Sequence, residues 1–173
     1  MPNRILVAID GSDIANRALT FASEISAKIG GDLTILHVLM HGEAREELEH
    51  LAVSEHLIAK STDEAPPNPI NLPRSITDIL AQPDGDKARA VSEIGDYIIE
   101  CARVVAQEAG ARNIRTRIES GDYADEILRV ASDIDADLLV LGRRGLSRVR
   151  SVLFGSVSDK VVQKAECDIT VIR

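Results

Sequence analysis

Short aliphatic runs that alternate with amphipathic stretches constrain the fold of this chain most strongly. The runs RILVAI (4–9), DLTILHVL (32–39) and DLLVLG (137–142) have the length and composition of buried strands. After the first run, apolar residues recur at helical spacing until Gly30 and Gly31, which favour the end of a helix. The same criteria predict further helices at 86–110, 121–136 and 155–165, and further strands at 113–119 and 168–173.

This order of elements predicts an α/β fold. Five strands alternate with helices, and aromatic residues make up only 2% of the chain, so Val, Ile, Leu and Ala must fill the core. We expect an open parallel sheet, Rossmann-like, with right-handed crossovers and helices on both faces. Ligands of such folds bind beyond the carboxyl ends of the strands, which directs attention to the loops after Ile9, Leu39, Glu119 and Leu141.

The segment at about 41–90 departs from this alternation. It is acidic and contains five of the six prolines, so we interpret it as an insertion within a single domain that spans 1–173. The insertion contains His41, His50 and His56, which are compatible with a metal site or a pH sensor but more commonly are separate surface histidines.

Charge and hydropathy exclude several classes of partner. The net charge is −8 and the isoelectric point is near 5.0, whereas nucleic acids and anionic membranes need an extended basic surface. No apolar run approaches the roughly 20 residues that span a bilayer. The first residues, MPNRILVAID, resemble a strand rather than a signal peptide. We therefore predict a cytoplasmic protein without a membrane span or a nucleic-acid partner.

The region after the strand at 137–142 combines glycines at a defined spacing. Gly142 is followed after two residues by Gly145, and after nine more by Gly155 and Ser156. Gly142 allows close approach of a ligand to the backbone, and Gly145 allows a turn. Gly155 and Ser156 begin a helix whose unpaired N–H groups favour an anion, with Ser156 as its expected cap and the Val157 N–H as a further donor.

Four arginines lie in this region, and Asp10 follows the first strand. The arginines form either a solvated face or an attractive surface for a phosphate group; they are Arg143, Arg144, Arg148 and Arg150. Asp10 is suited to bind ribose hydroxyls or a Mg²⁺ beside phosphates, and the alternative is that Asp10 or Ser12 shapes the turn and caps the next helix. We favour a ligand role for Asp10 because Ser12 or Asp13 can provide the cap.

Several motifs of known chemistry are missing from the sequence. There is no G-x-x-x-x-G-K-[ST], the first turn lacks G-x-G-x-x-G, and there is no G-x-S-x-G. The chain is therefore not a standard P-loop NTPase, dinucleotide dehydrogenase or α/β-hydrolase. We assign no catalytic residue and no residue as a dedicated metal ligand.

The chain resembles the universal stress protein family, and specifically its ATP-binding branch. The similar stretches are ILVAIDGSD, LTILHV, GDYADEI and the run from DLLVLGRRG to the end, which meets the family's spacing of G, two residues, G, nine residues, G and S or T. The resemblance implies the strand order 3-2-1-4-5, bound ATP with Mg²⁺ or Mn²⁺, and a homodimer that often pairs through the last strand. AMP is a second possible nucleotide.

The resemblance also implies roles for individual residues. Adenine would lie near Ile9, Val38 and Leu141, with the backbone of Val38 reading the base edge and Asp10 holding the ribose. Ser12, in the same turn, is a further candidate. The ribose and phosphates would be surrounded by Gly142, Arg143, Gly145, Gly155, Ser156 and Val157. The sequence departs from the family in its long insertion and in Asp168 and Ile169, where a Cys-Pro-Val run is common.

Three functions are consistent with the sequence. The first is a nucleotide-dependent regulatory protein of the stress response. The second is a slow Mg-dependent ATPase, for which Asp10 is the sole candidate base. The third is a nucleotide-free dimeric scaffold, which the intact glycine pattern disfavours. We favour the first.

Overall fold

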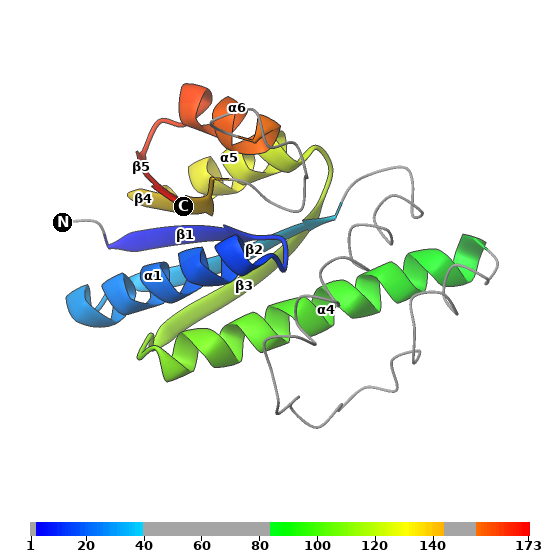
Figure 1. The fold of residues 1–173 in the computed structure, drawn as a ribbon, viewed down its shortest axis with the longest axis horizontal. Coiled ribbons are helices and arrows are strands. Elements are labelled where there is room, and N and C mark those ends of the chain that lie inside the picture. Colours follow the sequence, from blue (N-terminus) through cyan, green and yellow to red (C-terminus); the bar gives the residue numbers. More distant parts are fainter. Residues whose placement is uncertain (1–2, 40–83, 144–154) are drawn as a thin grey trace.

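The computed structural model describes residues 3–39, 84–143 and 155–173, and its strands form one open parallel sheet (Figure 1). The strands are β1 (Arg4–Ile9), β2 (Asp32–Leu39), β3 (Asn113–Ser120), β4 (Leu138–Gly142) and β5 (Asp168–Ile172). They lie in the order β3-β2-β1-β4-β5, and each neighbouring pair is parallel. This confirms the predicted sheet and its strand order.

Helices cover both faces of the sheet, as predicted. The described helices are α1 (Asp13–Ile29), α4 (Asp84–Glu108), α5 (Tyr123–Asp133) and α6 (Ser156–Lys164). Helices α1 and α4 pack on one face, and α5 and α6 pack on the other (Figure 1). None of the helices in the described ranges is both long and apolar enough to cross a membrane.

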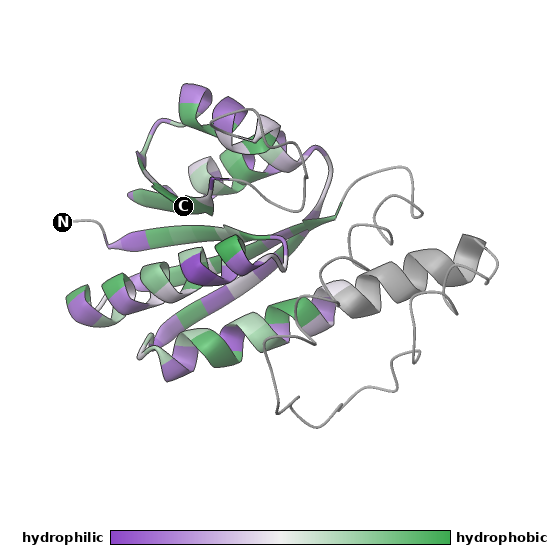
Figure 2. Ribbon diagram, viewed as in Figure 1, coloured by the Kyte–Doolittle hydropathy of each residue, from purple (hydrophilic) through white to green (hydrophobic). Residues whose placement is uncertain are grey.

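The core consists of two hydrophobic layers, one on each side of the sheet. Alternate residues of a strand point to opposite faces, so Ile5 and Val7 pack against α1 and α4 whereas Leu6 packs against α5. Hydrophobic residues follow the central strands almost without interruption (Figure 2). This double burial explains why the sequence of these strands reads as continuous aliphatic runs.

The ends of the helices follow from their capping groups. Ser12 caps α1 by accepting a hydrogen bond from the Ala15 N–H, and Gly30 ends the same helix with φ of 68°, which glycine adopts without strain. The prediction of a helix over 121–136 was too long at both ends. The Asp122 side chain accepts hydrogen bonds from the Ala124 and Asp125 N–H groups, so α5 begins at Tyr123. It ends at Asp133.

Helix α4 begins earlier than predicted. The sequence placed its start at 86 and the end of the insertion at about 90, but the helix runs from Asp84. The extent of the insertion stays a prediction. The three histidines of the insertion and its predicted short helix lie outside the described residues.

Candidate functional site

The turn after β1 is shaped by the side chains of Asp10 and Ser12. The Asp10 Oδ1 atom accepts a hydrogen bond of 3.0 Å from the Ser12 N–H, and Gly11 has φ of 78°, a conformation suited to glycine. The Ser12 hydroxyl in turn accepts a bond of 3.2 Å from the Ala15 N–H. Both residues thus have the structural role that we considered as the alternative. A ligand role for Asp10 stays a prediction.

His37 holds the end of β1 from the neighbouring strand β2. Its side chain is buried, and Nδ1 lies 3.0 Å from the carbonyl oxygen of Ile9, its register partner. A carbonyl oxygen only accepts hydrogen bonds, so Nδ1 carries the proton in this contact. The contact fixes the orientation of the peptide group that leads into Asp10.

Hydrogen bonds join the end of β4 to the start of α6. The Arg143 N–H donates to the Ile172 carbonyl over 2.6 Å, and the Gly155 N–H donates to the Arg143 carbonyl over 3.0 Å. The Ser158 hydroxyl lies 2.7 Å from the same Arg143 carbonyl oxygen. Gly142 and Gly155, the outer glycines of the motif, are therefore brought to one place at the carboxyl edge of the sheet. Gly145 lies outside the described residues.

The start of α6 differs from the prediction that Ser156 would cap it. The cap residue is Gly155, with extended φ and ψ of −72° and 158°, and no side chain caps the helix at this position. Ser156 is the first residue of the helix and is exposed. Because a helix leaves its first N–H groups without intrahelical partners, an uncapped start fits an anion such as a phosphate group.

The three residues predicted around adenine do not have their side chains on one face. Val38 and Leu141 are buried in the layer beneath α5 and α6, together with Val157. Ile9 belongs to the layer beneath α1 and α4, on the opposite face. Leu6 and Ala8 are the β1 residues on the same side as Val38 and Leu141, and Ala8 is the nearer of the two to the carboxyl end of the strand. Alternate residues of β1 point to opposite faces, so the side chains of Ile9, Val38 and Leu141 do not form one surface. Their place around adenine stays a prediction.

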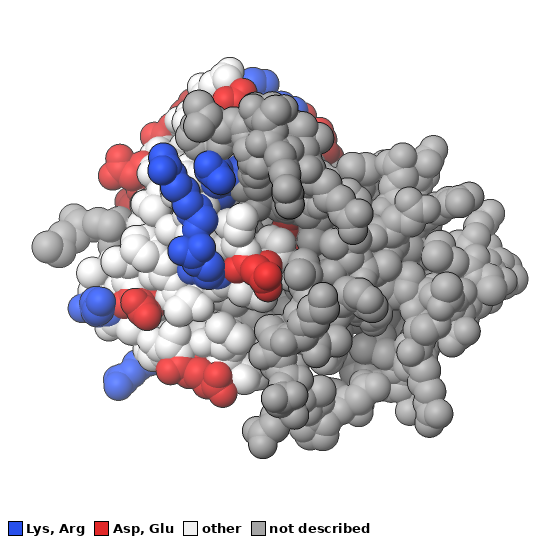
Figure 3. All heavy atoms as spheres, in the orientation of Figure 1, with Lys and Arg blue, Asp and Glu red and all other residues white. Residues whose placement is uncertain are grey.

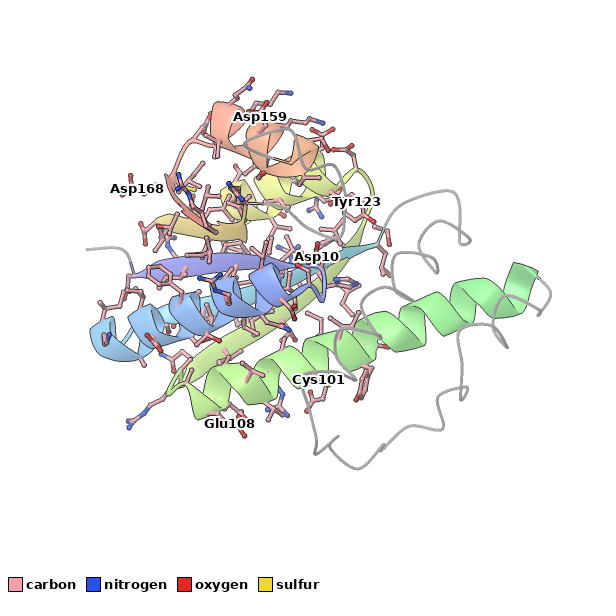
Figure 4. The ribbon with its side chains drawn as sticks, viewed as in Figure 1. Asp10, Cys101, Glu108, Tyr123, Asp159 and Asp168 are labelled. Carbon is pink, nitrogen blue, oxygen red and sulfur yellow. The ribbon has the colours of Figure 1, made fainter. Side chains whose placement is uncertain are left out.

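Two further residues near these elements were not selected from the sequence. Ser158 had no motif to mark it, and its contact with Arg143 depends on which face of α6 meets the end of β4. Tyr123 begins α5 and packs against the layer that contains Val38 and Leu141. Figure 4 shows Tyr123 and Asp10 toward the carboxyl edge of the sheet and Asp168, at the start of β5, toward the opposite edge.

The charged groups around the site are arranged in defined pairs. The Lys160 ammonium on α6 lies 3.0 Å from Asp122 and 2.8 Å from Asp125, both at the start of α5. The hydrogen bond from Lys160 is the main cause of a lowered pKa at Asp122, followed by the Asp125 N–H. Arg143 Nε is buried and makes no hydrogen bond within the described part of the chain.

Among the described residues, Lys and Arg side chains form a short row on the face seen in Figure 3, with an acidic group at its lower end. Other Asp and Glu side chains lie elsewhere on this face. Among residues 3–39, 84–143 and 155–173, no three His, Cys, Asp or Glu side chains are grouped to hold a metal ion.

Fold and site define an open α/β protein with a candidate binding site between β1 and β4, where the strand order reverses. The family model described as "Universal stress protein family" matches residues 1–173. The universal stress protein YxiE of Bacillus subtilis (strain 168) is 32% identical over 176 residues, which cover 100% of each chain. The chain therefore belongs to the universal stress protein family.

Solved structures of universal stress proteins share the fold. One is in complex with cAMP; it has a TM-score of 0.61 and 24% identity, and the alignment covers 99% of this chain and 97% of the other. A second, from Archaeoglobus fulgidus, is in complex with dAMP; it has a TM-score of 0.60 and 23% identity, with coverage of 100% and 98%. At this level of identity the likeness establishes the fold alone.

Proposed function

We propose that this protein binds an adenine nucleotide, ATP foremost, at the carboxyl edge of the sheet, and that binding regulates a partner or pathway of the stress response. The observation that carries the proposal is the pair of hydrogen bonds at the Arg143 carbonyl, from Gly155 and Ser158. They bring the end of β4 and the uncapped start of α6 together at the position where ligands of open α/β sheets bind.

The described residues fit the groups of a nucleotide. The backbone N–H groups of Ser156 and Val157 at the start of α6 suit a phosphate, and the Nε of Arg143, which has no hydrogen-bond partner among the described residues, is a further candidate donor. Val38 and Leu141 contribute apolar surface for a base. Asp10 is the candidate for the ribose hydroxyls, and Mg²⁺ or Mn²⁺ would accompany the phosphates.

The solved relatives support the choice of an adenine nucleotide over other anions. Those in complex with cAMP and dAMP carry different phosphate groups on the same base. Their base is the common feature, which favours adenine as the recognised group. AMP is the alternative to ATP. The spacing from Gly142 through Gly145 to Gly155 supports ATP, since it is the pattern of the ATP-binding branch.

Slow ATP hydrolysis is the second candidate activity. Hydrolysis needs a group that positions and deprotonates a water molecule, and Asp10 is the candidate at this edge. Its Oδ1 already accepts a hydrogen bond from the Ser12 N–H, so this oxygen is engaged in shaping the turn rather than held for a water molecule. We therefore propose binding without efficient turnover, and we assign no catalytic residue.

The proposed function is tested by identifying what the protein binds. The protein is purified without added nucleotide and denatured, and the released compound is identified by chromatography and mass spectrometry. Calorimetry then measures ATP, AMP and GTP, and ADP formation is followed with ATP and Mg²⁺. We expect adenine nucleotides to bind with negligible ADP production. Turnover that Asp10→Ala abolishes would establish the ATPase instead, and no affinity for any nucleotide would leave the scaffold.

We further propose that residues 1–173 form one domain, that the protein acts in the cytoplasm and that it is a homodimer paired through β5. The family match over the full range supports the first of these.

A further inference from the structure

We infer that Ser158 is a positioning residue: its hydroxyl ties the end of β4 to the start of α6, so that the phosphate-binding backbone is formed before the nucleotide arrives. The inference rests on the proposed nucleotide binding and extends it to a residue outside the glycine motif. We call the hydrogen-bonded unit of Arg143, Gly155 and Ser158 the loop stem, because it joins the residues on either side of 144–154.

The geometry of the Ser158 hydroxyl favours Arg143 as its acceptor. Ser158 is 3% exposed, and its Oγ lies 2.7 Å from the Arg143 carbonyl oxygen and 3.0 Å from that of Gly155. A hydroxyl has one hydrogen to donate, so these contacts compete. Each carbonyl also accepts one backbone hydrogen bond, that of Gly155 from the Asp159 N–H and that of Arg143 from the Gly155 N–H, so the distance decides between them. The shorter contact, to Arg143, is therefore the one that joins separate elements.

The Arg143 peptide connects three elements of the fold. Its N–H donates to the Ile172 carbonyl at the end of β5, and its carbonyl accepts from Gly155 and from Ser158 at the start of α6. If the hydroxyl is removed, the Gly155 N–H alone remains as donor to this carbonyl within the described residues. The stem would then depend on the single hydrogen bond from the Gly155 N–H to the Arg143 carbonyl. Gly155 is also the residue at which we propose that the phosphate approaches the backbone.

A preformed stem raises the affinity for a ligand that binds to it. Ordering a flexible backbone on binding costs free energy, and a site that is already ordered avoids that cost. The donors at the start of α6 act together on a phosphate only if the helix keeps its position relative to β4. Ser158 would therefore affect nucleotide affinity without touching the nucleotide.

Ser23 provides a matched control for the loss of a buried hydroxyl. Its side chain is fully buried in α1, and its Oγ donates to the Leu19 carbonyl over 2.7 Å. This contact spans four residues within one helix, whereas that of Ser158 with Arg143 spans fifteen residues and joins two elements. Removal of either hydroxyl deletes one buried hydrogen bond, but only Ser158 belongs to the stem.

The experiment compares Ser158→Ala, Ser158→Thr and Ser23→Ala with the wild-type protein. ATP affinity is measured by calorimetry well below each melting temperature. We expect about a tenfold loss for Ser158→Ala, which corresponds to about 1.4 kcal/mol, and wild-type affinity for Ser23→Ala. Ser158→Thr keeps the hydroxyl and should restore most of the affinity. Equal losses in the two alanine variants, or an unchanged Ser158→Ala, would overturn the inference.

A second measurement tests the stem without nucleotide. Amide hydrogen exchange by NMR reports the opening of the Gly155 N–H bond to Arg143. We expect faster exchange of this amide in Ser158→Ala than in the wild type or in Ser23→Ala. This comparison does not need the threonine variant, so it holds even where threonine is too large for the site. Unchanged exchange would refute the stem. A wild-type protein that binds no nucleotide would refute the proposed function, while faster exchange in Ser158→Ala would still support the stem.

Discussion

At the scale of single residues, the backbone at the start of α6 carries the proposed recognition. Gly155 has φ of −72° and ψ of 158°, which lie in the extended region that any residue adopts. A side chain at this position therefore does not strain the chain. Its effect is to occupy the space through which a phosphate approaches the N–H groups of α6.

We predict that Gly155→Val combined with Ser156→Ala lowers ATP affinity by about tenfold or more, because the valine blocks the approach and the alanine removes a donor. The melting temperature should stay close to that of the wild type. Calorimetry and thermal unfolding measure the two quantities. Val162→Ala, at an exposed position of the same helix, is the control and should bind ATP normally. Normal affinity in the double variant would show that the start of α6 does not bind the nucleotide.

The residue scale also shows what the sequence could and could not predict about the site. The glycine spacing predicted that Gly142 and Gly155 act together, and the structure brings their neighbourhoods into contact. The cap of α6 was assigned to Ser156, although Gly155 occupies that position. The contact of Ser158 with Arg143 could not be predicted from the sequence, because it depends on how α6 is rotated relative to β4.

At the scale of elements, the strands were more predictable than the helix ends. Strands β1, β2 and β4 are buried on both faces, so their aliphatic runs mark them without regard to their neighbours. The end of α5 depends on local geometry, since Ile134 caps the helix and the next residue, Asp135, adopts φ of 45°. Such conformations follow from the docking of the helix onto the sheet and leave little trace in the hydrophobic pattern.

Two carboxylates anchor the ends of elements and make stability depend on pH. The N–H groups of Asn3 and then Arg4 hold the pKa of Asp137 below its ordinary value of 3.8, which fastens the start of β1 to the residue before β4. Lys160, and then the Asp125 N–H, does the same for the pKa of Asp122 at the start of α5. A lowered pKa in the folded state means that the stabilisation is complete above 3.8 and is lost as the pH falls further.

We therefore predict that Asp137→Asn flattens the acid side of the stability curve. The wild-type free energy of unfolding should fall between about pH 5 and pH 2, and part of this fall should be missing in the variant. Urea unfolding at a series of pH values measures the difference. Asp96→Asn, at an exposed position of α4, is the control and should keep the wild-type slope. An identical slope in Asp137→Asn would show that this carboxylate does not contribute to acid unfolding.

At the scale of the whole molecule, the two edges of the sheet differ in chemistry. Edge strand β3 carries Arg115, Arg117 and Glu119, and these side chains form ion pairs with one another or with neighbouring elements. Edge strand β5 has no charged residue from Ile169 to Ile172. Charged side chains discourage the pairing of edge strands between chains, so β5 is the edge that is open to a second copy.

We predict a dimer that pairs through β5. A single charged side chain introduced on this strand should dissociate the dimer. The chain has a mass of 18.7 kDa, so sedimentation equilibrium should give twice this value for the wild type. Thr170→Lys places a charge on the partly buried edge strand and should give the monomer mass. Thr116→Lys makes the same change on β3 and should stay dimeric. The reverse result would place the interface at β3, and a monomeric wild type would exclude both edges.

The ATP affinity of the two variants then shows whether nucleotide binding needs the dimer. The two are connected through β5, because the Arg143 N–H of the loop stem donates to the Ile172 carbonyl of this strand.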